Sequence, residues 1–124
     1  MSNSVGLQND MIAETHWETI SRIVAPIAEG RYEDVSRLCD GSRLSAQEMK
    51  AAVAMYGRTI VPLPQEAASL ICSVRVQKAA DPTWSVVVPL FTREEGRSDL
   101  SLELMVTESQ PGSVAVHVDD LHVL

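Results

Sequence analysis

Residues 84–104 read WSVVVPLFTREEGRSDLSLEL, and this stretch decides the fold. The runs 84–92 and 98–107 alternate between apolar and polar side chains, which is the period-two pattern of half-buried strands. The polar segment between them contains Gly96, which can adopt a positive φ, so we expect a hairpin turn there. The stretch therefore predicts two antiparallel strands joined by a short loop.

Two further runs extend the sheet on either side of this hairpin. The runs 70–78 and 113–119 show the same alternation, and the connections are too short for the helical crossover that parallel neighbours require. We therefore expect four strands in a mostly antiparallel sheet. Pro89 has no N–H to donate, so it should lie at an edge or a bulge. Residues 59–64, TIVPLP, should run extended without regular structure because two prolines fix the backbone.

The alternation of the four runs separates a core face from a mixed face. The residues expected on the core face are Leu70, Cys72, Val74, Val76, Trp84, Val86, Val88, Leu90, Leu100, Leu102, Leu104, Val106, Val114, Val116 and Val118. The residues expected on the mixed face are Ser73, Arg75, Gln77, Ser85, Val87, Pro89, Ser101, Glu103, Met105, Thr107, Ala115, His117 and Asp119. The first set should lie against the helices, since none of its members is ordinarily charged at neutral pH.

Helix signals precede the strands. A Ser or Thr followed three residues later by Glu forms a capping box, and this spacing occurs at Thr15 with Glu18 and at Ser45 with Glu48. Apolar residues at helical spacing predict three helices, over 16–29, 31–39 and 46–56. Pro26 should kink the first helix or end it early. Helices followed by strands predict an α+β fold, with N-terminal helices packed on one face of the sheet.

Composition favours one soluble acidic domain. Of 124 residues, 45% are hydrophobic, so the chain can bury a core as a single domain over 1–124, with 1–13 as a flexible tail. Ten basic and seventeen acidic residues give a net charge of −7, which disfavours nucleic acid and anionic membranes as partners. We find no signal peptide and no apolar run long enough to cross a bilayer, so we expect a cytoplasmic protein.

Motifs for cofactors and catalysis are missing from the sequence. Cys39 and Cys72 lack C-x-x-C spacing and are expected to be reduced, buried thiols. Two histidines and two aspartates fall within 117–122, but their spacing matches no known metal motif, and no nucleotide-binding motif occurs. Ser98 with Asp99 lacks an identifiable base. We therefore expect no metal, no cofactor and no catalytic residue, and do not expect an enzyme.

The hairpin segment 93–99 is the most polar part of the chain. Its charged side chains are Arg93, Glu94, Glu95, Arg97 and Asp99. One interpretation is a solvated turn, in which Gly96 adopts a positive φ and Ser98 or Asp99 bonds to nearby amides. The other is a recognition loop, in which Arg97 and Asp99 form charge-assisted hydrogen bonds to a partner.

The mixed face is the second part of the candidate binding surface. Folding does not require apolar side chains opposite the core, yet Val87 and Met105 are expected there, among the polar residues Glu103 and His117. A modest apolar area with a polar rim is typical of non-obligate protein interfaces. We therefore expect a partner to contact this face together with the hairpin.

Four segments form a recognisable set: the strand and hairpin of 84–104, the closing VDDLHVL of 118–124, EGRYEDV at 29–35 and YGRTIVPLP at 56–64. Together they resemble a small family of bacterial domains of unknown function, and the resemblance covers most of the chain. It implies a fold but no activity. The order of helices and then a curved sheet is also similar to cystatin-like and NTF2-like folds, which host enzymes, binders and structural proteins alike.

A protein-binding module is the function that these features favour. Small size and an acidity that would complement a basic, nucleic-acid-acting toxin indicate an immunity or antitoxin-type inhibitor. Two alternatives stay open. One is a small regulatory or structural homodimer whose mixed faces pack together. The other is an NTF2-like small-molecule binder or enzyme, although the expected core face supplies almost no polar group for its pocket.

Overall fold

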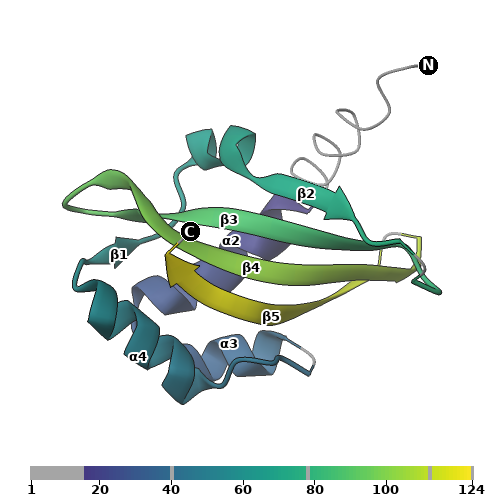
Figure 1. Cartoon of the computed structure of the whole chain (residues 1–124), viewed down its shortest axis with the longest axis horizontal. Helices are drawn as coiled ribbons and strands as arrows, with labels where there is room; N and C mark the ends of the chain where they lie inside the picture. The colour runs from purple at the N-terminus through teal and green to yellow at the C-terminus, as the bar shows by residue number, and fades with distance from the viewer. Residues whose placement is uncertain (1–15, 40, 78, 112, 124) are drawn as a thin grey trace.

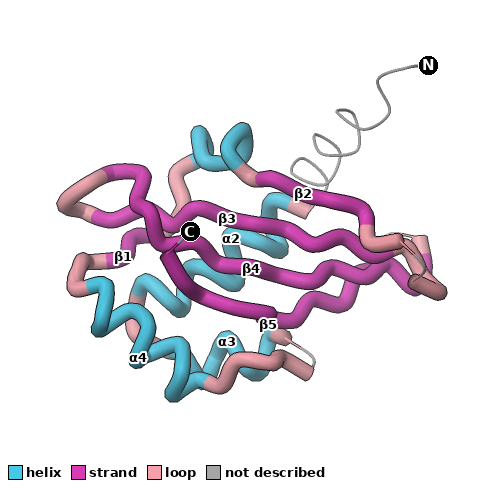
Figure 2. Tube along the Cα trace, in the orientation of Figure 1, coloured by secondary structure: helices cyan, strands magenta, loops and turns pink. Residues whose placement is uncertain are grey.

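The structure is a computed structural model, and it describes residues 16–39, 41–77, 79–111 and 113–123. Its elements are α2 (Trp17–Ala28), α3 (Tyr32–Leu38), α4 (Ala46–Tyr56), β1 (Ile60–Val61), the 3₁₀ helix η1 (Gln65–Leu70), β2 (Cys72–Arg75), β3 (Thr83–Thr92), β4 (Gly96–Gln110) and β5 (Ser113–Val123). The predicted α+β fold is confirmed: helices in the N-terminal half pack against a curled antiparallel sheet (Figures 1 and 2). The tail predicted over 1–13 lies outside the described residues.

Helix α2 forms close to the range predicted for it. Its apolar face is buried at Ile20, Ile23, Val24 and Ile27. Pro26 does not stop the helix, which continues to Ala28; its ring is buried, and its carbonyl accepts a hydrogen bond from Arg31 N (2.8 Å). The predicted cap residue Thr15 lies outside the described part of the chain, and His16 precedes the helix without a side-chain cap bond.

Helix α4 begins and ends where local signals place it. Glu48 N donates to Ser45 Oγ (3.1 Å), and Ser45 N donates to Glu48 Oε1 (2.9 Å), so the predicted capping box is formed. The hydrogen bonds from Ser45, chiefly that of its backbone N–H, lower the pKa of Glu48. Gly57 ends the helix with φ 76°, a left-handed conformation that strains any residue with a Cβ.

The sheet has five strands in the order β1-β3-β4-β5, with β2 also paired to β3, and all pairs are antiparallel. The extra strand β1 corrects the prediction of an irregular connector, because Ile60 pairs with Thr92 and Val61 with Phe91. Both β1 and β2 therefore share one edge of β3. Pro89 lies next to a register shift between β3 and β4, as a residue without an N–H is expected to.

The predicted alternation is wrong in β2. Ser73 is buried, whereas Cys72 is exposed and Val74 is 67% exposed. Ser73 lies opposite Val86, whose side chain is fully buried, so the neighbours of Ser73 must point to the other face. Cys72 is therefore not the buried thiol that the alternation predicts, while Cys39 is buried as expected.

Strand β5 runs beyond its predicted end at residue 119, and a bulge changes which side chains point inward. Asp119 is the extra residue between Val118 and Asp120, where the register against β4 shifts. Val118 is buried before the bulge and Leu121 after it. Two consecutive aspartates consequently point away from the core, which a regular strand does not allow.

The core lies between the sheet and the helices. Figure 1 shows α2 crossing behind the sheet, α3 and α4 along its β5 side, and no described helix in front of β3, β4 and β5. The sheet residues buried on the helix side are Val86, Val88, Leu90, Leu100, Leu102, Leu104, Val106, Val116, Val118 and Leu121. We call the opposite side of the sheet the open face. Among the described helices, none is long and apolar enough to span a bilayer.

Candidate functional site

Two glutamates fix the 93–99 hairpin to the corner between α4 and β1. The Glu94 carboxylate accepts hydrogen bonds from Thr59 N (2.9 Å) and Thr59 Oγ1 (2.8 Å), and these bonds hold its pKa below the usual value. Glu95 accepts from the Tyr56 hydroxyl at 2.9 Å. Glu94 lies 35 positions after Thr59 in the sequence, and Glu95 lies 39 positions after Tyr56. The hairpin is therefore held in one position relative to α4.

Ser98 is a third residue of the hairpin whose side chain is bonded within the fold. It is buried, its Oγ donates to Leu90 O (2.8 Å), and Leu100 N donates to the same Oγ (3.1 Å). The hydroxyl therefore bonds backbone groups on both strands where they leave the loop. This arrangement matches the local bonding that the solvated-turn interpretation describes.

The other charged side chains of the hairpin differ from those of Glu94 and Glu95, which are bonded within the fold. Arg93, Arg97 and Asp99 are exposed, and their side chains form no hydrogen bond or ion pair with any residue that the structure describes. Their backbone is nevertheless held: Arg93 N donates to Thr59 O (2.9 Å), and Asp99 N donates to the Tyr56 hydroxyl (3.2 Å). Charged groups on a fixed backbone are available for a partner without a large ordering cost.

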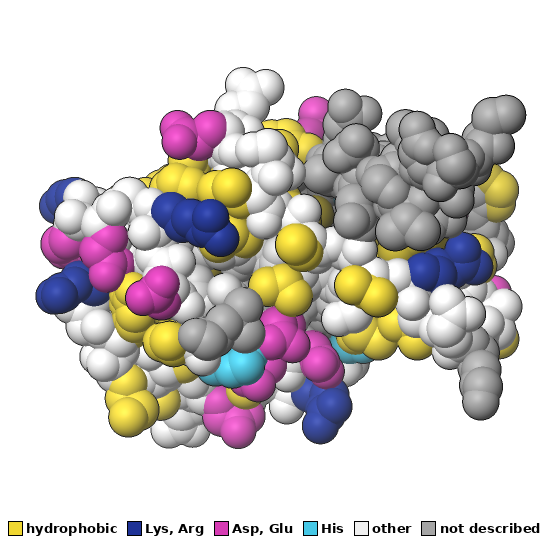
Figure 3. Space-filling model, turned by 45° about the horizontal axis from the view of Figure 1, so that its top comes forward, with side chains coloured by type: hydrophobic (Ala, Val, Ile, Leu, Met, Phe, Trp, Pro, Cys, Tyr) yellow, Lys and Arg dark blue, Asp and Glu magenta, His cyan; other side chains and the backbone are white. Residues whose placement is uncertain are grey.

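Apolar side chains lie on the open face toward β2. Val87 and Met105 are half-buried, and strand pairing sets Cys72 opposite Val87 and Met105 opposite Ser85. Figure 3 shows hydrophobic side chains in the middle of this side of the molecule. The exposed Val74 extends this apolar area, and its place here follows from the register of β2 that the sequence did not predict.

Acidic residues and histidines lie on the open face toward β5. His122 Nε2 forms an ion pair with Glu103 Oε2 and lies 3.8 Å from Asp120 Oδ2. The hydrogen bond to Glu103 is the main reason that the pKa of His122 is raised. The predicted residue His117 lies opposite Met105, on the same face. In Figure 3 acidic side chains gather around a histidine below the hydrophobic area.

The sequence did not indicate an apolar cleft of about 380 Å³ between α4 and the ends of β4 and β5. Its lining consists of Ala52, Met55, Tyr56, Leu100, Leu121, His122 and Val123. Met55 is 91% exposed, although a helix packed on a sheet normally points its methionines inward. We call it the α4–β5 cleft.

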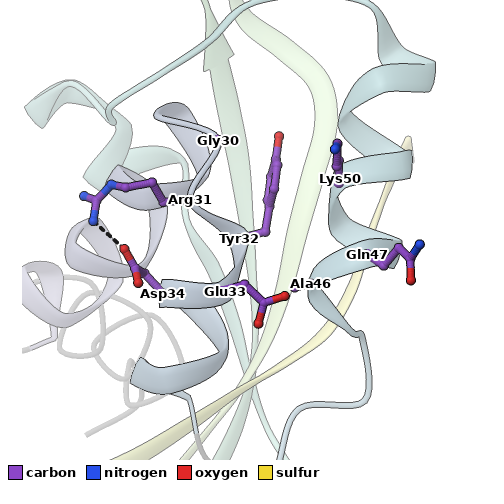
Figure 4. A pocket seen from close by; sticks show the side chains of 8 residues that line it. All are labelled: Gly30, Arg31, Tyr32, Glu33, Asp34, Ala46, Gln47 and Lys50. Atoms are coloured by element: carbon purple, nitrogen blue, oxygen red, sulfur yellow. Dashed lines mark hydrogen bonds and ion pairs between the residues drawn. The ribbon is translucent and has the colours of Figure 1, made fainter.

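A larger cleft of about 520 Å³ lies between α3 and α4 (Figure 4). Tyr32 and Lys50 stand on opposite sides of it, and burial raises the pKa of Tyr32. Arg31 is already paired with Glu29 and with Asp34. Two carboxylates therefore already neutralise this guanidinium, so it has less charge to offer a ligand.

The two thiols differ in setting. Cys39 is 7% exposed, and burial raises its pKa, which makes its thiolate scarce, whereas Cys72 is exposed. Over the residues placed by the structure, no three His, Cys, Asp or Glu side chains are grouped as metal ligands.

The comparisons with known proteins give a family and nothing beyond it. The family model described as "Domain of unknown function (DUF7668)" matches residues 24–124. No curated protein and no solved structure matches the chain. The topological similarity to cystatin-like and NTF2-like folds therefore stays a prediction.

Proposed function

We propose, from the premise that this chain belongs to the DUF7668 family of domains of unknown function, that it is a protein-binding module. Its binding surface is the 93–99 hairpin together with the adjacent open face. The hairpin side chains Arg97 and Asp99 are the polar anchors, with Arg93 beside them. On the open face Val87, Glu103, Met105 and His117 complete the surface, and Glu94 and Glu95 hold the hairpin in place.

The proposal rests on one observation, which is that the polar side chains of the hairpin fall into two groups. The side chains of Glu94, Glu95 and Ser98 are bonded within the fold, whereas among the described residues Arg97 and Asp99 are held only through their backbone. Folding alone does not require two opposite, unpaired charges on a fixed loop. Arginine is enriched at binding hot spots, and a fixed backbone leaves only side-chain freedom to be lost on binding.

The net charge of −7 points to a partner with a basic surface. Opposite charge speeds encounter and restricts the choice of partner. An immunity or antitoxin-type inhibitor of a basic, nucleic-acid-acting toxin in the cytoplasm fits this charge. The homodimer alternative would use the same open face, so the test below includes a measurement of oligomeric state.

The experiment is a pull-down from the native host with mass-spectrometric identification, followed by titration of the identified protein. Arg97→Ala and Asp99→Ala should each weaken binding at least about tenfold, since truncating a charge-paired anchor typically costs about 2 to 5 kcal/mol. Both variants should melt at the temperature of the unchanged protein.

The matched control is Glu94→Gln in the same hairpin, because its carboxylate is bound to Thr59. This variant should lower the melting temperature and change affinity less than Arg97→Ala. If Arg97→Ala and Asp99→Ala bind normally but melt early, the hairpin is a structural turn and the proposal fails. A concentration-dependent dimer that Met105→Glu dissociates would favour the homodimer instead.

A further inference from the structure

The α4–β5 cleft borders both parts of the proposed surface. Tyr56, which lines it, donates to Glu95 and accepts from Asp99 N, so one wall also supports the hairpin. His122 lines the other side and is paired with Glu103 on the open face. A partner that contacts the hairpin and the β5 side of the open face therefore lies next to this cleft.

The lining of the cleft is mostly apolar, apart from the Tyr56 hydroxyl and the His122 ring. Leu100 and Leu121 are 2% and 3% exposed and belong to the core. Met55 and Val123 are 91% and 53% exposed, which leaves large apolar side chains in water. Burying such surface is worth roughly 25 cal/mol per Å². The cleft would thus gain from an apolar group that fills it.

The charge around the cleft is negative on the side of His122. Ser45 lowers the pKa of Glu48, one turn before Ala52 on α4, and Asp120 is close enough to oppose part of that lowering. Glu103 and Asp120 are the carboxylates beside His122, while Asp119 is paired with Arg43 at 3.5 Å. An apolar group that arrives with positive charge would satisfy both the cleft and its rim.

We propose that the α4–β5 cleft receives an apolar side chain from a basic, amphipathic segment of the protein partner, whose Lys or Arg side chains meet Glu48, Glu103 and Asp120. The inference rests on the proposed function and assigns the apolar centre of the interface to this cleft. An apolar anchor in a pocket with charged groups around it is the usual arrangement of a hot spot. Methionine suits such a site, because its flexible side chain adapts to different anchors.

The first experiment titrates the full chain with a synthetic amphipathic helical peptide of leucine and lysine, followed by methyl NMR. The Met55 and Val123 methyl signals should shift, and added salt should weaken the binding. The same peptide with glutamate in place of lysine should not bind. Equal binding of both peptides, or shifts confined to other methyls, would overturn the inference.

Met55→Glu separates insertion into the cleft from plain charge attraction. This variant adds a negative charge, so it would strengthen binding of a lysine peptide if charge alone acted. We expect it to weaken binding at least about tenfold because the apolar wall is lost. Leu38→Glu is the matched control, since Leu38 is a 47% exposed apolar residue at the end of α3. It should bind the peptide as the unchanged chain does.

The two proposals fail separately. Arg97→Ala should leave binding of the leucine–lysine peptide unchanged, because Arg97 does not line the cleft. If Met55→Glu binds the native partner as well as the unchanged chain does, the cleft is not part of the interface, while the role of the hairpin is untouched. Methyl shifts that depend on protein concentration without peptide would show a second copy in the cleft and overturn the inference.

Discussion

The two faces of the sheet are built from the same strands and differ in almost everything else. Leu102 and Met105 lie on β4 only three positions apart, yet Leu102 is fully buried against the helices and Met105 is half-buried on the open face. The helix side carries mainly apolar side chains, with Ser73 among them. The open face combines apolar residues with an acidic group, and the hairpin beside it carries unpaired charges. The difference teaches that the residues needed for folding and those offered to a partner can be changed separately.

The largest effect should come from the helix side of β4. Leu102→Ala should lower the free energy of unfolding by about 2 to 5 kcal/mol, through lost transfer energy and the cavity that remains. Met105→Ala, the control on the opposite face, should cost much less. Urea denaturation of both variants measures the difference, and equal losses would show that the two faces are not energetically distinct.

Thiol reactivity sharpens the comparison between buried and exposed positions. In native protein the exposed Cys72 should react with a disulfide reagent at least about a hundredfold faster than Cys39, which must wait for local opening. Burial also raises the pKa of Cys39 and so lowers its thiolate fraction. Cys72→Ser should remove the fast phase. If Cys39→Ser removes it instead, the exposure of the two cysteines is the reverse of the structure.

A smaller effect should follow from loosening the hairpin. Tyr56→Phe removes the hydroxyl that donates to Glu95 and accepts from Asp99 N, so it should cost about 1 kcal/mol of stability. Tyr32→Phe is the matched control, because the hydroxyl of Tyr32 has no hydrogen-bond partner in the described residues. Thermal melts of the pair provide the measurement. Equal melting temperatures would mean that α4 does not anchor the hairpin.

The smallest effect should be the pH dependence of His122. The hydrogen bond to Glu103 is the main reason that its folded pKa is raised above 6.5, and the charge of Asp120 adds to this effect. Glu48 on α4 is the further charged group that faces Asp120. The pair therefore stabilises the fold fully below about pH 6.5, and this contribution is lost as pH rises through the folded pKa. NMR titration should show the raised pKa, and Glu103→Gln should lower it. An unchanged His122 pKa in that variant would contradict the contact.

Sequence signals within a few residues predicted the helix ends and the long strands. Helix α4 begins at the capping box of Ser45 and Glu48 and ends at the left-handed Gly57. Each end is therefore set by one to four neighbouring residues. The long alternation of 84–92 and 98–107 likewise predicted β3 and β4, because a one-residue slip would bury many polar side chains. Strands and helices of this kind are readable without knowledge of their neighbours.

What the sequence could not show depends on distant partners. In the short strand β2, the inward position goes to Ser73 because Val86 lies opposite it, while Ala67 and Ile71 supply apolar side chains to the core. The bulge at Asp119 similarly depends on pairing with β4. The α4–β5 cleft needs both α4 and β5 in place, so it has no signature in either segment.

The short strands β1 and β2 pair with the same edge of β3, so part of that edge has no strand beside it. β1 ends opposite Phe91 and β2 begins opposite Val87, which leaves a gap in strand pairing. Thr83 O accepts from Val76 N (2.8 Å) on this side, and by alternation Pro89 directs its backbone the same way. Proline has no N–H, so the gap cannot offer that donor to a strand of another chain. Pro89 thereby leaves one donor fewer at this edge, which discourages edge-to-edge pairing.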